Sequence, residues 1–238
     1  MLIDHIGAVV LEYGLFYQGG AGRMEVLLEQ PWGVFLYPLS LFLRILGRPA
    51  FPIYCFLLTE GFIHTADRKR YGRNLLLFGL ISEIPFNLAV ANRVFHPAYQ
   101  NVFFELFIGF LILCRIEWAE KRAYGAGEMN LVCLYTLIGC GASILVGADY
   151  NAIGILMIVF LYRFRNSRRK QTAAAGVIGF LETLFPTLGA GALAAIPIWF
   201  YNGKRGKQQM KFLFYWFYPL HLLILFLIRW YFLGIPLE

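Results

Sequence analysis

The feature that most constrains this chain is a succession of apolar segments, each close to the length of a membrane helix and joined by short loops. A helix needs about 20 mainly apolar residues to cross the hydrocarbon core of a bilayer. The candidate spans are 2–17, 49–66, 72–91, 101–118, 129–147, 150–162, 172–185, 187–201 and 212–233. The sequence therefore predicts an all-α, polytopic transmembrane helix bundle with about nine spans, which we interpret as one domain over residues 1–238.

Composition excludes the main alternatives to a membrane protein. Apolar residues make up 59% of the chain and charged residues 15%, whereas soluble domains have about 45–50% and about 25%. A soluble globule of this size could not cover its surface with so few polar groups. A soluble enzyme, a disordered chain and a disulfide-rich secreted scaffold are therefore excluded, and strands are not expected because an open sheet cannot cross a bilayer.

Two stretches leave the span count open. Pro186 alone divides segments 172–185 and 187–201, so these could form one kinked span instead of two. Residues 34–46 are amphipathic, which predicts a helix lying in the membrane interface, with a tenth span as the alternative.

The basic residues are distributed by loop. Loops 67–73, 115–122, 163–170 and 204–211 are rich in Lys and Arg, and they alternate with loops near 93, 149 and 186 that carry one basic residue or none. Because cytoplasmic loops carry the excess of basic residues, the pattern predicts a cytoplasmic N-terminus and an external C-terminus. Topology thus accounts for the net charge of +7, and we expect no nucleic-acid partner.

The cysteines give no sign of a metal site or of a disulfide framework. Cys55, Cys114, Cys133 and Cys140 all lie inside apolar segments and lack CxxC spacing. We interpret them as small apolar packing residues.

Ionisable residues inside membrane helices are costly and mark functional sites by default. Glu60 and His64 lie four residues apart, so they share one helix face, where the carboxylate can orient the imidazole as a general base. The alternative is an ion pair that braces helices near the cytoplasmic interface.

Three further ionisable residues are candidates for the same chemistry. Asp4 and His5 are adjacent, so on a helix they point about 100° apart and each must serve a different partner, unless both lie idle at a frayed end. His221 follows Pro219 near the middle of the last span, where a kink could shape a polar cavity. The alternative for His221 is a hydrogen bond that holds two helices together.

Glu83 and Asn87 are also four apart, with Pro85 between them, and predict another inward polar face. The basic loops are candidates for binding the phosphates of an acyl-CoA through charge-assisted hydrogen bonds, the alternative being that they only set topology. The cofactor-binding candidates are Arg68, Lys69, Arg70, Arg73, Lys204 and Arg205.

Several blocks together resemble the TraX family of conjugal-transfer-associated membrane proteins. These blocks are MLIDHIG, LGRPAFPIYCFLLTEGFIHT, RYGRNLLLFGLISEIPFNL, QNVFFELFIG, ADYNAIGILMIVFLY, YNGKRG and FYWFYPLHLLIL. They cover about half of the chain in family order. The resemblance implies acetylation of the N-terminal amine of a pilin subunit, in the cytoplasmic membrane of a bacterium. It extends distantly to integral-membrane acyltransferases that use acetyl-CoA to O-acetylate surface sugars.

The resemblance also implies site residues. His5 would match the first-helix histidine that is the suspected general base of the wider superfamily. The other matching positions that we expect at the substrate are Arg48, Glu83, Asn87, Gln100, Asn101, Asp149, Tyr150, Asn202 and Tyr218. The chain departs from the family pattern at Glu105, where a small hydroxyl residue is usual, and at Asn151, where glycine is usual. Relatives usually also carry a basic residue before the Asp-His pair, which here follows Met1 closely.

Together these observations predict a membrane acyltransferase that moves an acetyl group from acetyl-CoA to an amine or hydroxyl, on a pilin N-terminus or a cell-surface molecule, without a metal. His5 or His64 would be the base, and Arg48 or a helix terminus would stabilise the oxyanion. The alternatives are a proton-coupled transporter of small solutes and a non-catalytic partner in pilus or secretion assembly.

Overall fold

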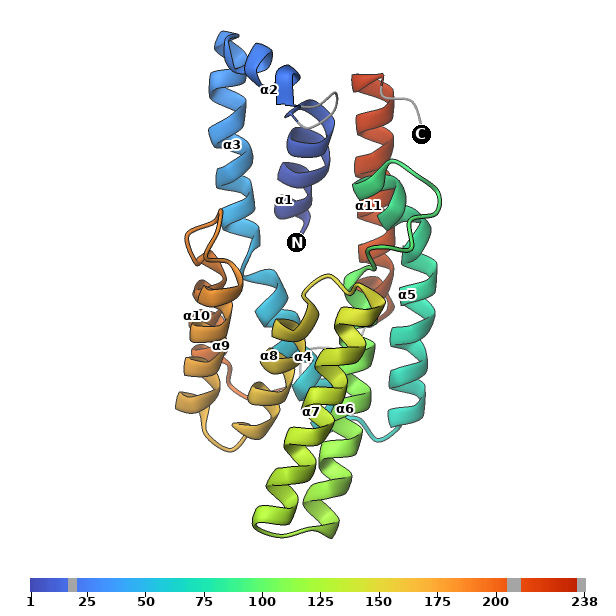
Figure 1. Cartoon of the computed structure of the whole chain (residues 1–238), viewed down its shortest axis with the longest axis vertical. Coiled ribbons are helices and arrows are strands. Elements are labelled where there is room, and N and C mark those ends of the chain that lie inside the picture. Colours follow the sequence, from blue (N-terminus) through green and yellow to red (C-terminus); the bar gives the residue numbers. More distant parts are fainter. Residues whose placement is uncertain (17–20, 205–210, 235–238) are drawn as a thin grey trace.

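The computed structural model describes residues 1–16, 21–204 and 211–234, which form an elongated bundle of helices (Figure 1). Within those ranges the structure has no strand, and its only β pairing is an isolated bridge between Gln100 and Ala148. The prediction of an all-α bundle is confirmed.

The elements follow one another with short connections. They are α1 (Leu2–His5), the π-helical η1 (Ile6–Phe16), α2 (Ala21–Leu28), α3 (Pro31–Gly47), α4 (Ala50–His64), α5 (Arg68–Ala91), α6 (Val102–Arg122), α7 (Ala126–Val146), α8 (Asn151–Arg163), α9 (Arg168–Glu182), the 3₁₀-helical η2 (Ala190–Ala194), α10 (Ala195–Phe200) and α11 (Lys211–Leu233).

The bundle has two halves along its long axis (Figure 1). In the upper half, η1 packs between α3 and α11. In the lower half, α8 packs against α4, α6, α7 and α9. Helix α1 begins at mid-height, beside the junction of α3 and α4, so the first residues of the chain lie in the middle of the bundle (Figure 1).

Among the residues that the structure describes, four helical stretches are long and apolar enough to cross a membrane: Pro31–His64, Arg68–Ala91, Ala126–Val146 and Tyr215–Leu233. Shorter apolar helices cover Asn151–Arg163 and Ala190–Phe200. Residues 34–46 belong to the first of these stretches, in which α3 runs along the long axis and leads into α4 (Figure 1). Their placement thus favours the tenth-span alternative over a helix lying flat in the interface.

The segments on either side of Pro186 form two separate short helices that pack against each other. The chain reverses between them, and Thr183 ties the reversal together: its hydroxyl donates to the Gly179 carbonyl at 2.7 Å and accepts from the Gly191 N–H at 2.8 Å. A Cβ on Gly191 would lie 2.5 Å from the Gly179 carbonyl oxygen, so the close approach requires glycine. The single kinked span is therefore not what the chain forms.

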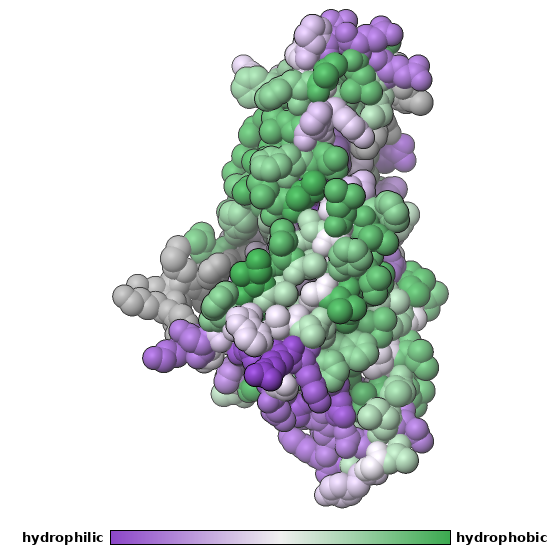
Figure 2. Space-filling model, turned by 90° about the vertical axis from the view of Figure 1, so that its left-hand side faces the viewer, coloured by the Kyte–Doolittle hydropathy of each residue, from purple (hydrophilic) through white to green (hydrophobic). Residues whose placement is uncertain are grey.

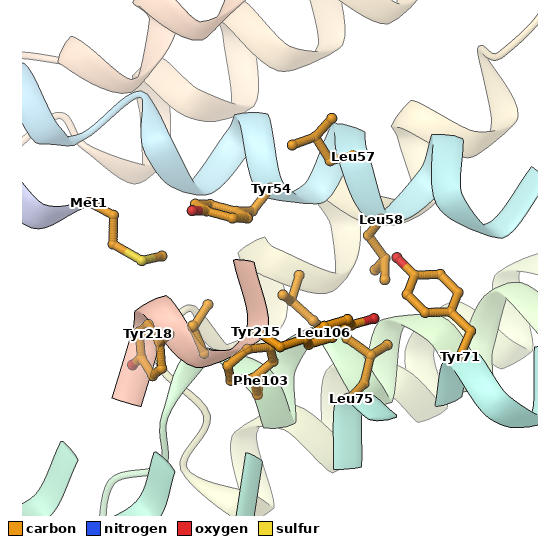
Figure 3. A pocket seen from close by; sticks show the side chains of 11 residues that line it. Met1, Tyr54, Leu57, Leu58, Tyr71, Leu75, Phe103, Leu106, Tyr215 and Tyr218 are labelled. Atoms are coloured by element: carbon orange, nitrogen blue, oxygen red, sulfur yellow. The ribbon is translucent and has the colours of Figure 1, made fainter. Parts of the chain in front are cut away.

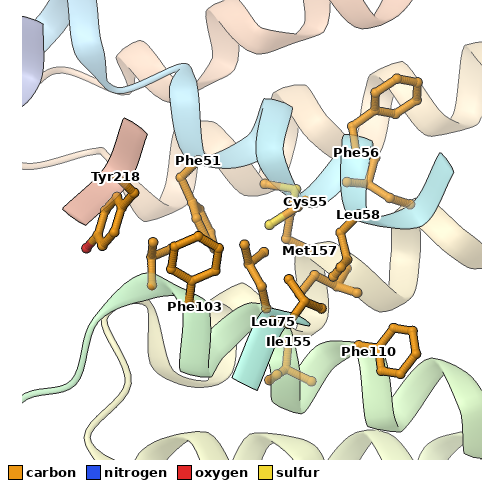
Figure 4. Packing of buried hydrophobic residues seen from close by; sticks show 14 of the residues in the cluster. Phe51, Cys55, Phe56, Leu58, Leu75, Phe103, Phe110, Ile155, Met157 and Tyr218 are labelled. Atoms are coloured by element: carbon orange, nitrogen blue, oxygen red, sulfur yellow. The ribbon is translucent and has the colours of Figure 1, made fainter. Parts of the chain in front are cut away.

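Aromatic and aliphatic side chains fill the centre of the lower half (Figure 4). Phe51 and Cys55 of α4 pack with Phe103 of α6 and Ile155 of α8 in one continuous apolar cluster. Burying this area is the main driving force for packing in water, but in a bilayer close packing itself must hold the helices together.

The outer surface is also apolar. On α7, Leu137 is 70% exposed and Leu145 is 88% exposed. On the face shown in Figure 2, hydrophobic residues form a broad zone, with polar residues gathered at the upper end and in the lower part. An exposed apolar zone of this extent between polar ends is typical of a surface covered by lipid.

Candidate functional site

The polar residues at mid-height form one network around Asp4. Arg44 Nη1 donates to Asp4 Oδ2 at 2.7 Å, and Arg48 Nε lies 3.5 Å from Asp4 Oδ1. Arg44 Nε also lies 3.4 Å from Glu12 Oε2. Because Arg44 and Arg48 are four residues apart at the end of α3, both reach the same face of α1.

Gly47 makes this approach of α1 to α3 sterically possible. A Cβ at residue 47 would lie 2.1 Å from the Asp4 Cβ, a separation that no side chain could accept. The Asp4 carboxylate can therefore come between the two guanidinium groups only because residue 47 is glycine.

His5, next to Asp4, has a different partner, as the 100° step along the helix predicts. His5 Nδ1 lies 2.7 Å from His221 Nε2, and His221 Nδ1 lies 2.6 Å from the carbonyl oxygen of Phe217. The two imidazole rings stack with centroids 4.9 Å apart, so helices α1 and α11 are joined by this pair.

The direction of these hydrogen bonds identifies the basic atom. A carbonyl oxygen can only accept, so His221 Nδ1 must carry the proton. In a neutral His221 the lone pair is then on Nε2, which accepts from His5 Nδ1–H. In a neutral His5 the remaining lone pair is on Nε2, and the arrangement leaves this nitrogen as the proton acceptor.

The loop 147–150 contributes Asp149 and Tyr150 to the same region of the bundle. The Tyr99 hydroxyl donates to Asp149 Oδ1, and the Gln100 backbone N–H donates to the Gly147 carbonyl at 2.8 Å. The Tyr150 ring stacks on the Phe51 ring with centroids 3.3 Å apart. Contacts from the loop before α6 and from α4 therefore hold Asp149 and Tyr150 in place.

Two of the departures from the family pattern, Asn151 and Glu105, have local explanations here. Asn151 has φ +50°, a left-handed conformation that asparagine accepts better than other residues with a side chain. Glu105 is fully buried and accepts a hydrogen bond of 2.7 Å from the Ser143 hydroxyl. Gly154 leaves room for Glu105, because a Cβ there would lie 2.5 Å from Glu105 Oε1.

A small cavity of about 20 Å³, with room for about one water molecule, lies within this network. Its polar lining residues are Asp4, His5, Arg48, Asp149, Tyr150 and Tyr218. Asp4 Oδ1 and Arg48 Nε are buried, and neither has a hydrogen-bond partner in the part of the chain that the structure describes. The site thus joins an orientated imidazole to a carboxylate and a guanidinium with hydrogen-bonding capacity to spare.

Three of the predicted substrate-binding residues lie behind this cavity instead of lining it. Asn101 Nδ2 donates to Glu83 Oε2 at 2.8 Å and to the Gly79 carbonyl at 2.9 Å, while Asn87 donates to Glu83 Oε1 at 3.1 Å. These bonds fasten the start of α6 to α5. Glu83, Asn87 and Asn101 therefore support the loop that carries Tyr99 and Gln100.

Glu60 and His64 lie in a different hollow, of about 700 Å³, at the basic end of the bundle. His64 Nε2 is 3.6 Å from Glu60 Oε2, and the His64 side chain is 60% exposed. Residue 64 is about 21 Å along α4 from Ala50, which lines the small cavity with His5. The structure separates the two predicted histidine sites instead of uniting them.

Only some of the predicted cofactor-binding residues line this hollow. Arg70 and Lys204 line the hollow with His64, whereas Lys69 and Arg73 are not among its described lining residues. Arg68 instead forms a bidentate ion pair with Glu117. Asn202 accepts the Lys204 N–H at 2.9 Å and so shapes the turn, while Arg205 lies outside the described residues.

Sequence reasoning missed Arg44 and Tyr99. Arg44 could have been found from its spacing of four residues from Arg48, but its segment was interpreted as interfacial. Tyr99 lies in a loop and carries no sequence signal that distinguishes it. In residues 1–16, 21–204 and 211–234, no three His, Cys, Asp or Glu side chains gather as a metal ion would require.

Comparison with known proteins gives one family and one relative. A family model described as TraX protein matches residues 1–229. The chain is 28% identical over 207 residues to a protein of Dichelobacter nodosus named "Probable fimbrial assembly protein FimC, serogroup H1", and the alignment covers 77% of this chain and 81% of that protein. No solved structure matches the chain significantly.

Proposed function

The chain belongs to the TraX family, and from that premise we propose that this pilus-related membrane protein is an acyltransferase that moves an acetyl group from acetyl-CoA to an amine. The acceptor that we propose is the N-terminal amine of a pilin subunit. We place the protein in the bacterial cytoplasmic membrane with its basic loops inside, where acetyl-CoA is available.

The observation that carries this proposal is the directed pair of imidazoles at the small cavity. His221 donates to a carbonyl oxygen through Nδ1 and accepts from His5, which leaves His5 Nε2 as the basic atom. His5 lines the cavity together with Arg48, a cation with a free N–H. A positioned base beside a positioned donor is what acyl transfer requires.

The proposed step balances without a further reactant. The acceptor nitrogen attacks the thioester carbonyl, an N–C bond forms, and His5 Nε2 takes the proton that the amine loses. The C–S bond then breaks, and the same proton passes from His5 to the departing sulfur to give the free thiol of coenzyme A. Arg48 would stabilise the negative charge that develops on the carbonyl oxygen.

Transfer of a labelled acetyl group tests the proposal. We expect the protein in lipid nanodiscs, supplied with acetyl-CoA carrying a radiolabelled acetyl group, to label a pilin-derived peptide with a free N-terminal amine. A peptide with a blocked amine and free hydroxyls distinguishes amine from hydroxyl acceptors. His5→Ala should lose labelling, while His96→Ala, which removes a histidine that lines neither hollow, should retain it. Equal labelling by both variants would exclude His5 as the base.

The name of the relative favours a second candidate, a non-catalytic role in fimbrial assembly. Under that hypothesis, a His5→Ala variant would restore pilus formation fully in cells that lack the protein. Under the acyltransferase hypothesis, the same cells would make pilin whose N-terminus stays unacetylated, which intact-mass measurement would detect.

A further inference from the structure

A third cavity, of about 360 Å³, lies between α4, α5, α6 and α11, and its walls are apolar apart from four tyrosines (Figure 3). The tyrosines are Tyr54, Tyr71, Tyr215 and Tyr218. Leu58, Leu75 and Leu106 fill the wall between them (Figure 3).

The tyrosine cavity shares lining residues with both hollows described above, so these three lie in series. Val102 and Tyr218 line both the tyrosine cavity and the small cavity that contains His5. Leu57, Tyr71 and Tyr215 line both the tyrosine cavity and the hollow at the basic end. The tyrosine cavity therefore connects the basic end of the protein with the imidazole pair.

Helix α4 shows the order of the three environments along one element. Ala50 faces the small polar cavity, Tyr54 and Leu58 face the tyrosine cavity, and Glu60 and His64 face the basic hollow. Residues 50–64 span about 21 Å of helix. A ligand lying beside α4 would meet cations first, then an apolar wall with hydroxyls, and last the base.

We infer that the tyrosine cavity holds the flexible arm of the acyl-CoA donor, with Tyr54 and Tyr71 as hydrogen-bond partners of its amide groups. This inference rests on the proposed acyl transfer. The arm of coenzyme A consists of methylene and methyl groups interrupted by two amides, its phosphates are anionic, and its other end is the thioester. That order of groups matches basic hollow, tyrosine cavity and small cavity.

Gly61 supports the position given to Tyr71. A Cβ on Gly61 would lie 2.7 Å from the Tyr71 hydroxyl, so the hydroxyl lies directly over this glycine of α4. Tyr215, which lines the same cavity, forms a side-chain hydrogen bond with Asn74. A lipid tail is the competing occupant. A hydrocarbon tail, however, has no polar group that could bind the tyrosine hydroxyls or pair with Arg70 and Lys204 in the basic hollow.

The test compares two donors of the same acetyl group, acetyl-CoA and the acetyl thioester of N-acetylcysteamine, which keeps only the last part of the arm. Tyr54→Phe and Tyr71→Phe should each raise KM for acetyl-CoA about 2- to 10-fold, as expected for one lost hydrogen bond, with little change in kcat. KM for the short thioester should stay within twofold. Leu57→Trp, at a half-exposed position, should block the passage. It should lower kcat/KM for acetyl-CoA at least about tenfold more than kcat/KM for the short thioester.

Binding provides a readout that does not depend on turnover. Isothermal titration of coenzyme A into the protein in nanodiscs should show weaker binding for Leu57→Trp and for Tyr71→Phe than for the unchanged chain. Ile138→Trp, at a 54% exposed position on α7, is the matched control and should bind normally.

The possible failures are distinguishable. If the unchanged chain transfers acetyl from neither donor, the proposed function fails. If it transfers from both and the variants affect both donors equally, the assignment of the cavity is wrong while the function stands. A photoreactive phospholipid that labels Tyr71, with no competition from coenzyme A, would likewise overturn the assignment in favour of a lipid tail.

Discussion

Two charged clusters of this protein use the same residue types, but they differ in how many of their carboxylate and guanidinium atoms have hydrogen-bond partners. At the basic end, Glu120 accepts from Arg163 Nη1 at 2.6 Å and from Arg165 Nη2 at 2.9 Å, and the Tyr162 hydroxyl donates to it at 3.2 Å. Glu128 shares Arg163 at 2.8 Å. In this basic-end cluster both oxygens of Glu120 have donors.

The mid-height cluster around Asp4 is different. Asp4 Oδ1 and Arg48 Nε are 3.5 Å apart, too far for a good hydrogen bond, and neither has another hydrogen-bond partner among the residues that the structure describes. Unpaired buried polar atoms cost free energy, and under the proposed function the bound substrate would complete them. The two clusters therefore differ in unused hydrogen-bonding capacity beside the small cavity and not in the presence of charge.

The largest effect that we expect from one substitution is that of Asp4→Ala. Removing this carboxylate leaves two largely buried guanidinium groups without their shared partner, which costs about 3–5 kcal/mol when a buried pair is broken. We expect a lower yield of folded protein and a lower thermal midpoint in detergent. Asp4→Asn is the matched variant, because its amide oxygen can still accept from Arg44, and it should recover much of the loss. Equal stability of the Ala variant and the unchanged chain would contradict the network described here.

Glu120→Gln tests the basic-end cluster. The amide keeps the size of the side chain but loses the charge that holds Arg163 and Arg165, so we expect unfolding to become easier by about 1.5–3 kcal/mol. Acetyl transfer at the remaining folded fraction should change by less than about twofold. Glu29→Gln, on the exposed part of the turn after α2, is the control for charge removal and should leave the thermal midpoint unchanged. A loss of activity without loss of stability would reverse the roles that we give to the two clusters.

His221→Phe separates orientation of the base from packing. The phenyl ring can keep the stacking against Phe217 and His5 but cannot accept from His5 Nδ1. We expect kcat for acetyl transfer to fall about tenfold, the equivalent of about 1.4 kcal/mol, with a smaller change in KM. If kcat is unchanged, the imidazole pair braces α1 against α11 and does not orientate a base.

The smallest effect should come from Asn151→Gly. Glycine adopts φ +50° without strain, so both stability and activity should stay close to those of the unchanged chain. Asn151→Val is the contrast: a β-branched residue at positive φ should cost about 1–2 kcal/mol and displace Asp149 and Tyr150. Thermal midpoints of the two variants, measured side by side, check this prediction.

Much of the fold could be predicted because each span carries its own signal. Apolar segments of helical length indicate α5, α7 and α11 independently of one another, and the alternation of basic loops orders them. The orientation of the helix over residues 34–46 could not be predicted in the same way. Their amphipathic pattern suits either a flat helix or a span, and contacts with η1 decide in favour of a helix along the bundle axis.

The candidate site, too, could be predicted only in part. The sequence alone identified Asp4, His5 and His221, because an ionisable group in an apolar segment is conspicuous wherever it occurs. The sequence also separated Asp4 from His5, since adjacent helical residues point in different directions. Glu60 and His64 were equally conspicuous, and their closeness to the basic loop 67–73 indicated the cytoplasmic end, but nothing local showed which histidine lies beside the small cavity.

Only the tertiary structure decided which of these residues meet. His5 and His221 are 216 positions apart, and Arg44 reaches Asp4 across 40 positions, so no local pattern could have paired them. The route formed by the three hollows likewise needs α4, α5 and α11 together, and its tyrosines look like ordinary membrane aromatics in one dimension. Sequence determined which groups are costly to bury, because that cost belongs to each side chain, whereas their partners depend on how the helices pack.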